Sequence, residues 1–206
     1  MRLLKSLVID TAHRYRHDRI FNKIIRTLNF RKYHSLLDIG CSYQKRYYKF
    51  FSNLKMENLD IDKSASPTYV MDIQKEVPKK KYDVITAFQV LEHIPEIDLA
   101  IRNIAGILNP KGVFIASIPM FHTIHGIDYN RYTDRALKFH FSKFFYEVRV
   151  IQYGNPVFYF LKCVSHVPIV GVPFNFLGPL LEKIIIYDSK LNPSGYFIIA
   201  KGPLRT

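Results

Sequence analysis

The chain has 206 residues, of which 48% are hydrophobic and 15% aromatic, and it carries a formal net charge of +13. This length fits one domain with a sizeable core, and the hydrophobic content excludes a chain of the disordered class. The positive charge attracts nucleic acid, anionic headgroups or acidic substrates without choosing among them. The two cysteines provide neither a disulfide framework nor a CxxC metal pattern.

Residues 1–34 form a basic segment in which nine Lys or Arg accompany two Asp. Apolar residues at helical spacing predict an amphipathic helix over residues 14–29. The start of the chain lacks the long apolar core of a secretory signal. Residues 163–181 carry no formal charge, but three prolines and two glycines would break a membrane-spanning helix. We therefore expect a cytoplasmic location, with peripheral contact to a membrane as the alternative.

From residue 35 onward, short apolar runs alternate with helical stretches. This alternation predicts an α/β fold with a mostly parallel sheet and helices on both faces. The expected strands are residues 35–39, 57–61, a short strand before Asp72, 82–88, 113–118, 146–152 and 195–200, and the expected helices are 43–54 and 96–108. Residues 155–191, which are aromatic and punctuated by proline, predict an apolar, lid-like insertion in a domain spanning residues 35–206.

The ends of the expected strands carry groups that suit a nucleoside-containing ligand. In an open parallel sheet, ligands bind at the carboxyl ends of the strands. Gly40 follows the first strand and allows a tight turn, and Asp60 lies twenty residues later, where a carboxylate can accept hydrogen bonds from a ribose. Asp72 follows the third strand and can accept from an adenine amino group. A nicotinamide dehydrogenase fits less well, because the G-x-G-x-x-G fingerprint is missing.

Five segments together resemble the successive motifs of small, type 11-like class I S-adenosylmethionine (SAM)-dependent methyltransferases. They are residues 36–42 (LLDIGCS), 59–62 (LDID), 71–73 (MDI), 82–94 (YDVITAFQVLEHI) and 108–119 (LNPKGVFIASIP). The resemblance covers about residues 35–153 and the final strand. It implies a Rossmann-like, seven-stranded sheet with the last strand antiparallel, and SAM as the cofactor.

The same resemblance assigns cofactor-binding roles to residues of this chain. It implies that Asp38 and Gly40 shape the loop around the methionine part of SAM, that Asp60 holds the ribose, that Asp72 and Ile73 flank the adenine, and that Ala87 and Phe88 line the methionine end. Ser42 and Ile61 complete the set of predicted cofactor-binding residues. The family usually has further glycines two and four residues after the first, where this chain has Ser42 and Gln44. This departure keeps a non-catalytic SAM-fold binding or scaffold module as an alternative.

Methyl transfer to a hydroxyl requires a base that takes its proton. The candidate catalytic residues are His93, His122, His125, Tyr129 and Arg131. The alternative for His93 is a hydrogen bond that fixes its own loop. Residues 119–133 resemble a segment of type 11-like methyltransferases, and their position favours a pocket for an anionic or sugar-like acceptor. The alternative there is an internal Asp128–Arg131 ion pair, followed by Thr133 as the cap of a helix. We expect no metal site, because nothing completes a ligand set around the two histidines of the HxxH pattern.

The function predicted from the sequence is SAM-dependent methylation of a small-molecule, glycan or lipid-linked acceptor, with an oxygen as the preferred target. RNA methylation is the second hypothesis, motivated by the net charge. The fourth strand is not followed by the Asn/Asp-Pro-Pro-aromatic motif that many base N-methyltransferases use, which argues against RNA.

Overall fold

The computed structural model describes residues 21–41, 45–121, 127–154 and 193–204. The chain forms two compact units, a larger one of residues 28–119, 124–151 and 196–206 and a smaller one of residues 1–27, 120–123 and 152–195. In the smaller unit, residues 21–27 are helical, as the amphipathic pattern predicts. The whole of the expected insertion at 155–191, including the uncharged stretch 163–181, lies outside the described residues.

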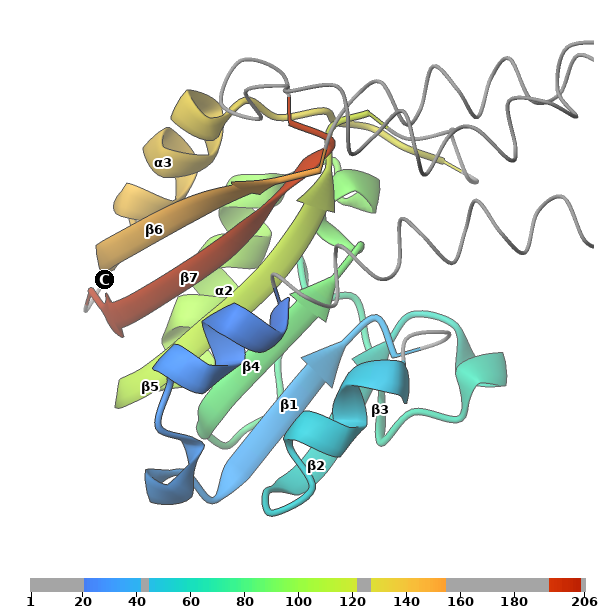
Figure 1. Ribbon diagram of the computed structural model, residues 1–206. Coiled ribbons are helices and arrows are strands. Elements are labelled where there is room, and N and C mark those ends of the chain that lie inside the picture. The colour runs from blue at the N-terminus through green and yellow to red at the C-terminus, as the bar shows by residue number, and fades with distance from the viewer. Residues whose placement is uncertain (1–20, 42–44, 122–126, 155–192, 205–206) are drawn as a thin grey trace, which may run out of the picture. The chain divides into compact units, whose positions relative to one another are not determined.

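A seven-stranded sheet organises the larger unit (Figure 1). Its strands are β1 (Ser35–Ile39), β2 (Lys55–Asp60), β3 (Tyr69–Val70), β4 (Tyr82–Phe88), β5 (Leu108–Pro119), β6 (Phe145–Tyr153) and β7 (Gly195–Pro203). The spatial order is β3-β2-β1-β4-β5-β7-β6. Strands β1 to β5 pair in parallel, and β7 runs in the opposite direction to its neighbours. The Rossmann-like fold with one antiparallel strand is therefore confirmed.

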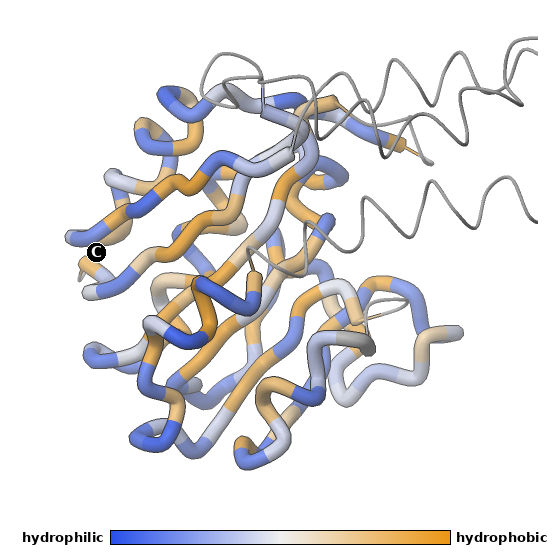
Figure 2. The backbone as a smooth tube through the Cα atoms, in the orientation of Figure 1, coloured by the Kyte–Doolittle hydropathy of each residue, from blue (hydrophilic) through white to orange (hydrophobic). Residues whose placement is uncertain are grey.

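The central strands are buried along nearly their whole length, which is typical of a parallel sheet covered on both faces. In β4 all residues except Asp83 are buried, and in β5 burial is continuous from Val113 to Pro119. Figure 2 shows hydrophobic residues running along these strands and hydrophilic ones at the connections. Helix α2 (Ile97–Ile107) contacts β5 and α3 (Asp134–Ser142), and it buries Ile97, Ala100, Ile101, Ile104, Ala105 and Ile107.

The expected helix over residues 43–54 is wrong in its type and extent. The described part is a short 3-10 helix, η2 (Lys45–Phe50). Tertiary contacts of two tyrosines explain the difference: the Tyr47 ring lies 4.6 Å from that of Phe88, and the Tyr48 hydroxyl donates to Asp38 Oδ2 at 2.9 Å. These contacts hold two successive tyrosines against residues of the sheet. This packing outweighs the local preference for an α-helix.

Strand β5 begins earlier than expected, directly after α2. Residues 109–112 do not form a separate turn; instead the register with β4 shifts between Tyr82 and Val84. Gly112 is required there, because a Cβ atom at this position would lie 2.7 Å from the main-chain oxygen of Asp83. The helix thus passes into the strand without a connecting loop.

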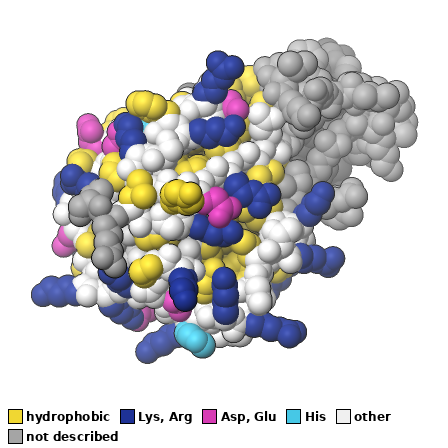
Figure 3. All heavy atoms as spheres, turned by 90° about the vertical axis from the view of Figure 1, so that its left-hand side faces the viewer, with side chains coloured by type: hydrophobic (Ala, Val, Ile, Leu, Met, Phe, Trp, Pro, Cys, Tyr) yellow, Lys and Arg dark blue, Asp and Glu magenta, His cyan; other side chains and the backbone are white. Residues whose placement is uncertain are grey.

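Basic side chains are scattered over one face of the molecule. On the face shown in Figure 3, Lys and Arg side chains outnumber acidic ones but lie scattered among them. Several basic side chains of the described residues pair with acidic ones, including Lys143 with Asp98 at 2.6 Å and Lys201 with Glu147 at 3.6 Å. On this face the charge is not gathered into one groove. None of the helices in the described part of the chain has both the length and the apolar character that a membrane span requires.

Candidate active site

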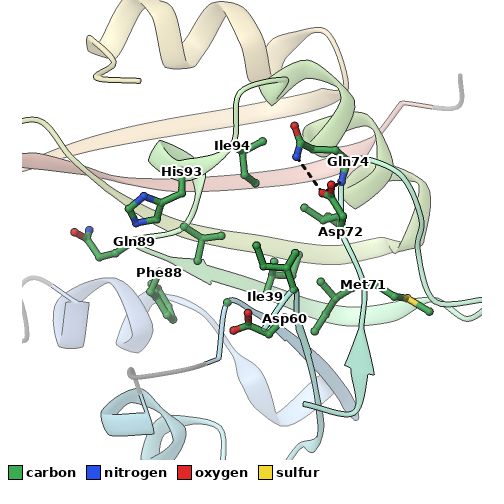
Figure 4. A pocket seen from close by; sticks show the side chains of 14 residues that line it. Ile39, Asp60, Met71, Asp72, Gln74, Phe88, Gln89, His93 and Ile94 are labelled. Carbon is green, nitrogen blue, oxygen red and sulfur yellow. Dashed lines mark hydrogen bonds between the residues drawn. The ribbon is translucent and has the colours of Figure 1, made fainter. Parts of the chain in front are cut away.

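A cavity of about 430 Å³ opens at the carboxyl ends of β1, β2, β3 and β4, where ligands of open α/β sheets bind. In Figure 4, Met71, Asp72 and Gln74 lie on one side of it and Phe88, Gln89 and His93 on the other. The lining residues are Ile39, Gly40, Leu59, Asp60, Ile61, Met71, Asp72, Ile73, Gln74, Phe88, Gln89, Val90, His93 and Ile94. The cavity lies within the larger unit, and its walls are mostly apolar with a few polar groups between them.

Gly40 forms the turn after β1, and two independent constraints require a glycine there. Its φ of +75° lies in the left-handed region, and a Cβ atom would lie 2.3 Å from Val90 Cγ2. Its main-chain N–H donates to the oxygen of Leu59 at 2.8 Å, which ties the turn to β2. The turn therefore brings main-chain groups to the cavity wall without a side chain in the way.

Asp60, at the end of β2, offers the cavity an acceptor. Its Oδ1 accepts from the main-chain N–H of Asp62 at 3.0 Å, which fixes the carboxyl group. Its Oδ2 is buried and has no hydrogen-bond partner among the described residues. A buried acceptor without a partner carries a desolvation cost that a hydroxyl donor on a ligand would remove. The geometry fits the predicted contact with a sugar diol.

Asp72 lines the cavity, but one of its carboxyl oxygens already accepts hydrogen bonds from Gln74. Asp72 Oδ1 accepts from both the main-chain N–H and Nε2 of Gln74 at 3.0 Å, and Lys75 Nζ lies 3.3 Å from Oδ2 (Figure 4). Burial alone would raise the pKa of Asp72, but these contacts hold it below its usual value. Gln74 Oε1 in turn accepts from the Glu96 N–H at 3.0 Å. Sequence reasoning missed Gln74, since no motif points to a side chain that folds back on its neighbour.

Asp38 supports the site from behind. It is buried and does not line the cavity; Thr86 Oγ1 donates to its Oδ1 at 2.6 Å and Tyr48 to its Oδ2. Burial raises the pKa of Asp38 to about 6, against the opposing effect of these hydrogen bonds. The carboxyl group therefore links β1, β4 and η2 behind the Gly40 turn. Ala87 is likewise fully buried in the sheet, whereas the adjacent Phe88 reaches the cavity.

His93 ends the short helix η4 (Leu91–His93) after β4 and lines the cavity. Its Nδ1 lies 3.0 Å from the main-chain oxygen of Ile127 and 2.8 Å from Asp128 Oδ1. One N–H cannot point straight at both oxygens, and the angle favours the carbonyl, so Asp128 Oδ1 keeps no well-aligned hydrogen bond. The His93 ring therefore makes a loop contact through Nδ1 and also lines the cavity, so the two alternatives for this residue do not exclude each other.

Residues 127–131 are held against the η4 loop by main-chain bonds. The oxygen of Glu92 accepts from the N–H groups of Tyr129 at 2.9 Å and Asn130 at 3.2 Å, and Asn130 Nδ2 donates to the oxygen of Ile94 at 3.0 Å. Burial, helped by the nearby charge of Asp128, raises the pKa of Glu92 to about 8, against the opposing effects of a main-chain hydrogen bond and of Arg131. Glu92 is 2% exposed, and its Oε2 has no partner in the described part of the chain.

The expected local structure of this segment is confirmed. Arg131 Nη2 pairs with Asp128 Oδ2, and the Thr133 hydroxyl accepts from the N–H of Ala136 at 3.2 Å as the N-cap of α3. Tyr129 is 56% exposed, so its side chain remains accessible at the surface beside η4. The other three predicted site residues, Ser42, His122 and His125, lie outside the described residues. The described residues contain no group of three or more side chains arranged for a metal.

Comparisons with known proteins give one family and a set of structures with the same fold. A family model described as a methyltransferase domain matches residues 12–151. The PH0226 protein of Pyrococcus horikoshii OT3 aligns over 92% of this chain and 91% of its own, with a TM-score of 0.58 and 12% identity. The N-methyltransferase NodS of Bradyrhizobium japonicum WM9 aligns over 91% and 97%, with a TM-score of 0.57 and 13% identity. Residues 961–1257 of the StiE O-methyltransferase align over 89% and 73%, with a TM-score of 0.54 and 15% identity. No curated protein sequence matches at a significant level.

Proposed function

The chain belongs to the methyltransferase-domain family and is a SAM-dependent enzyme, and on that premise we propose that it methylates an oxygen of a small-molecule, glycan or lipid-linked acceptor. The observation that carries the proposal is the position of His93, an imidazole on the wall of the cavity at the end of β4. Relatives with the same fold include an O-methyltransferase and an N-methyltransferase, so the fold alone does not choose the atom.

The residues of the cavity fit SAM. With SAM bound, the main chain at Gly40 would lie at the methionine part, Asp60 Oδ2 would accept from the ribose hydroxyls, and Ile73 would flank the adenine. Phe88 contributes apolar surface toward the methionine end. Asp72 holds Gln74 in place, and the Gln74 side chain then borders the adenine side. When bound, SAM supplies an activated methyl group, so the protein has to align the acceptor and exclude water.

The acceptor side is formed by η4 and residues 127–131. Ile127 is 70% exposed and Tyr129 56% exposed, so an apolar and an aromatic side chain are presented beside His93. Such surface suits the ring of a sugar or the apolar part of a lipid-linked acceptor. Arg131 is already paired with Asp128, which makes it a support of this segment rather than a free anion-binding group. His93 is placed to take the proton that the acceptor hydroxyl loses.

The test follows the methyl group. The protein is incubated with methyl-tritiated SAM and an extract of the source organism, and label is counted in the water-soluble, lipid and purified RNA fractions. We expect label in the water-soluble or lipid fraction and at least a roughly 100-fold loss of transfer in His93→Gln. His34→Gln, which alters an exposed histidine at the opposite ends of the strands, is the matched control and should behave as the wild type.

Other outcomes separate the alternatives. Label in the RNA fraction alone would replace the proposal with RNA methylation. SAM binding without transfer to any fraction would support the non-catalytic module. Label in an amine-containing product that His93→Gln forms at the wild-type rate would remove the oxygen-directed assignment.

A further inference from the structure

We infer that Ile127 and Asp128 hold the His93 ring with its proton on Nδ1, so that Nε2 is presented unprotonated as the proton acceptor of the site. Asp128 is then a positioning residue, which acts through His93 and touches no substrate. The inference rests on the proposed function for the role of Nε2, but the state of the ring is a property of the protein alone.

The position of the ring proton follows from the two oxygens beside Nδ1. A main-chain carbonyl oxygen and a carboxyl oxygen lie within 3.0 Å of this nitrogen, and both are hydrogen-bond acceptors. An unprotonated Nδ1 would direct its lone pair at two other lone pairs. The neutral imidazole carries one proton, so placing it on Nδ1 leaves Nε2 with a free lone pair.

Within the described part of the chain, Nε2 remains available to a ligand. The nearest carboxyl oxygen to it there is Glu92 Oε1 at 3.9 Å, which is too far for a hydrogen bond. The raised pKa of Glu92 keeps this carboxyl largely protonated near pH 7, so it does not draw a proton onto Nε2. The His93 side chain is 41% exposed and lines the cavity (Figure 4).

The two oxygens beside Nδ1 are fixed from both directions. Arg131 pairs with the other oxygen of Asp128, whose side chain is 7% exposed. The bonds of Tyr129 and Asn130 to the Glu92 oxygen hold the main chain on which Ile127 and Asp128 lie. A change of the Nδ1 contacts would therefore also disturb the Asp128–Arg131 ion pair.

The proton balance of methyl transfer to oxygen fits this arrangement. As the acceptor oxygen bonds to the methyl carbon, the carbon–sulfur bond breaks with its electron pair staying on sulfur, and the hydroxyl proton passes to Nε2. The resulting imidazolium carries a proton on each nitrogen, and the Nδ1 proton faces Ile127 and Asp128. The opposite tautomer would present an N–H to the acceptor and could take no proton there.

The test is nitrogen NMR of the full-length protein, which reports the tautomer of a neutral histidine without any acceptor. The His93 signal is identified among the eight histidines by its loss in His93→Gln. We expect wild-type His93 to show a protonated Nδ1 and an unprotonated Nε2. Asp128→Asn should shift the ring partway toward the mixed tautomers of free histidine, because the Ile127 oxygen still accepts from Nδ1. Asp134→Asn, the same change at the first residue of α3, should leave the ring unaltered.

A proton on Nε2 in the wild type, or an unchanged spectrum in folded Asp128→Asn, would overturn the inference. If Asp128→Asn does not fold, the wild-type spectrum alone decides between the tautomers. SAM titration separates this result from the proposed function. If the wild type binds SAM but carries the His93 proton on Nε2, only the role of Asp128 is rejected. If the wild type does not bind SAM, the enzyme assignment is rejected, whatever the tautomer of His93.

Discussion

The proposed cofactor side and the proposed acceptor side of the site are built in different ways. On the cofactor side, the groups lie at the ends of neighbouring parallel strands, and each is fixed by its own local geometry, as at Gly40 and Asp60. On the acceptor side, η4 and residues 127–131 come together although 34 positions separate His93 from Ile127. The cofactor side thus depends on backbone conformation and the acceptor side on a long-range contact. Changes on the two sides should therefore separate SAM binding from the alignment of the acceptor.

The largest effect is expected at the turn after β1. Gly40→Ala places a Cβ atom in a left-handed conformation and against Val90, which we expect to lower the free energy of unfolding by about 3 kcal/mol and to abolish SAM binding. Denaturant unfolding and calorimetric titration measure the two effects. Gly106→Ala in α2 is the control, because its Cβ meets nothing within 4 Å and should stabilise by about 0.5–1 kcal/mol. Equal behaviour of the two variants would show that the turn is not constrained as described.

The buried carboxyl of the acceptor side should make stability depend on pH. The pKa of Glu92 is raised to about 8 in the folded protein, so the folded state binds a proton that the unfolded state has released. Its contribution to stability is present at about pH 5 and is lost as pH rises through 8. Relative to Glu92→Gln, which cannot ionise, the wild type should lose roughly 3 kcal/mol of unfolding free energy over this range.

Asp38 also has a raised pKa, but this residue is present in both the wild type and Glu92→Gln. Its contribution to the pH dependence of stability therefore cancels when the two proteins are compared. Denaturant unfolding of both proteins at several pH values measures the difference. Parallel pH curves for wild type and Glu92→Gln would mean that Glu92 ionises in the folded protein as it does in water.

A smaller effect, confined to SAM affinity, is expected at the end of β2. Asp60→Asn keeps an oxygen for the N–H of Asp62 but weakens the acceptor that faces the cavity. We expect a loss of about 2 kcal/mol, or roughly thirtyfold in the dissociation constant for SAM. The exposed Glu76→Gln loses the same charge outside the cavity and should bind as the wild type does. If both variants bind equally well, Asp60 does not contact the cofactor.

The same division explains what could be predicted from the sequence. Strand periodicity identifies β1, β2 and β4, and parallel pairing then gathers Gly40, Asp60 and Asp72 at one edge of the sheet. The role of Gln74 could not be predicted, because its hydrogen bond to Asp72 depends on a side-chain conformation that the sequence does not specify. The contact of Asp128 with His93 was not predicted either, although the ion pair of Asp128 with Arg131, three residues apart, was one of the two alternatives considered for this segment. Local contacts leave a pattern in the sequence, whereas contacts between distant loops leave none in a single chain.

The smallest effect tests whether the two sides are energetically separate. Thr133 caps α3 directly after residues 127–131, so Thr133→Ala removes the acceptor for the Ala136 N–H and should cost about 1 kcal/mol of unfolding free energy. SAM affinity should not change, because the cap lies outside the cavity and contacts none of its lining residues among the described bonds. Ser142→Ala at the other end of α3 removes only an exposed bond to the Phe139 oxygen and should change stability by less than about 0.5 kcal/mol. A parallel loss of SAM affinity in Thr133→Ala would mean that α3 and the cofactor side are energetically coupled. The cofactor side and the acceptor side would then not be independent of each other.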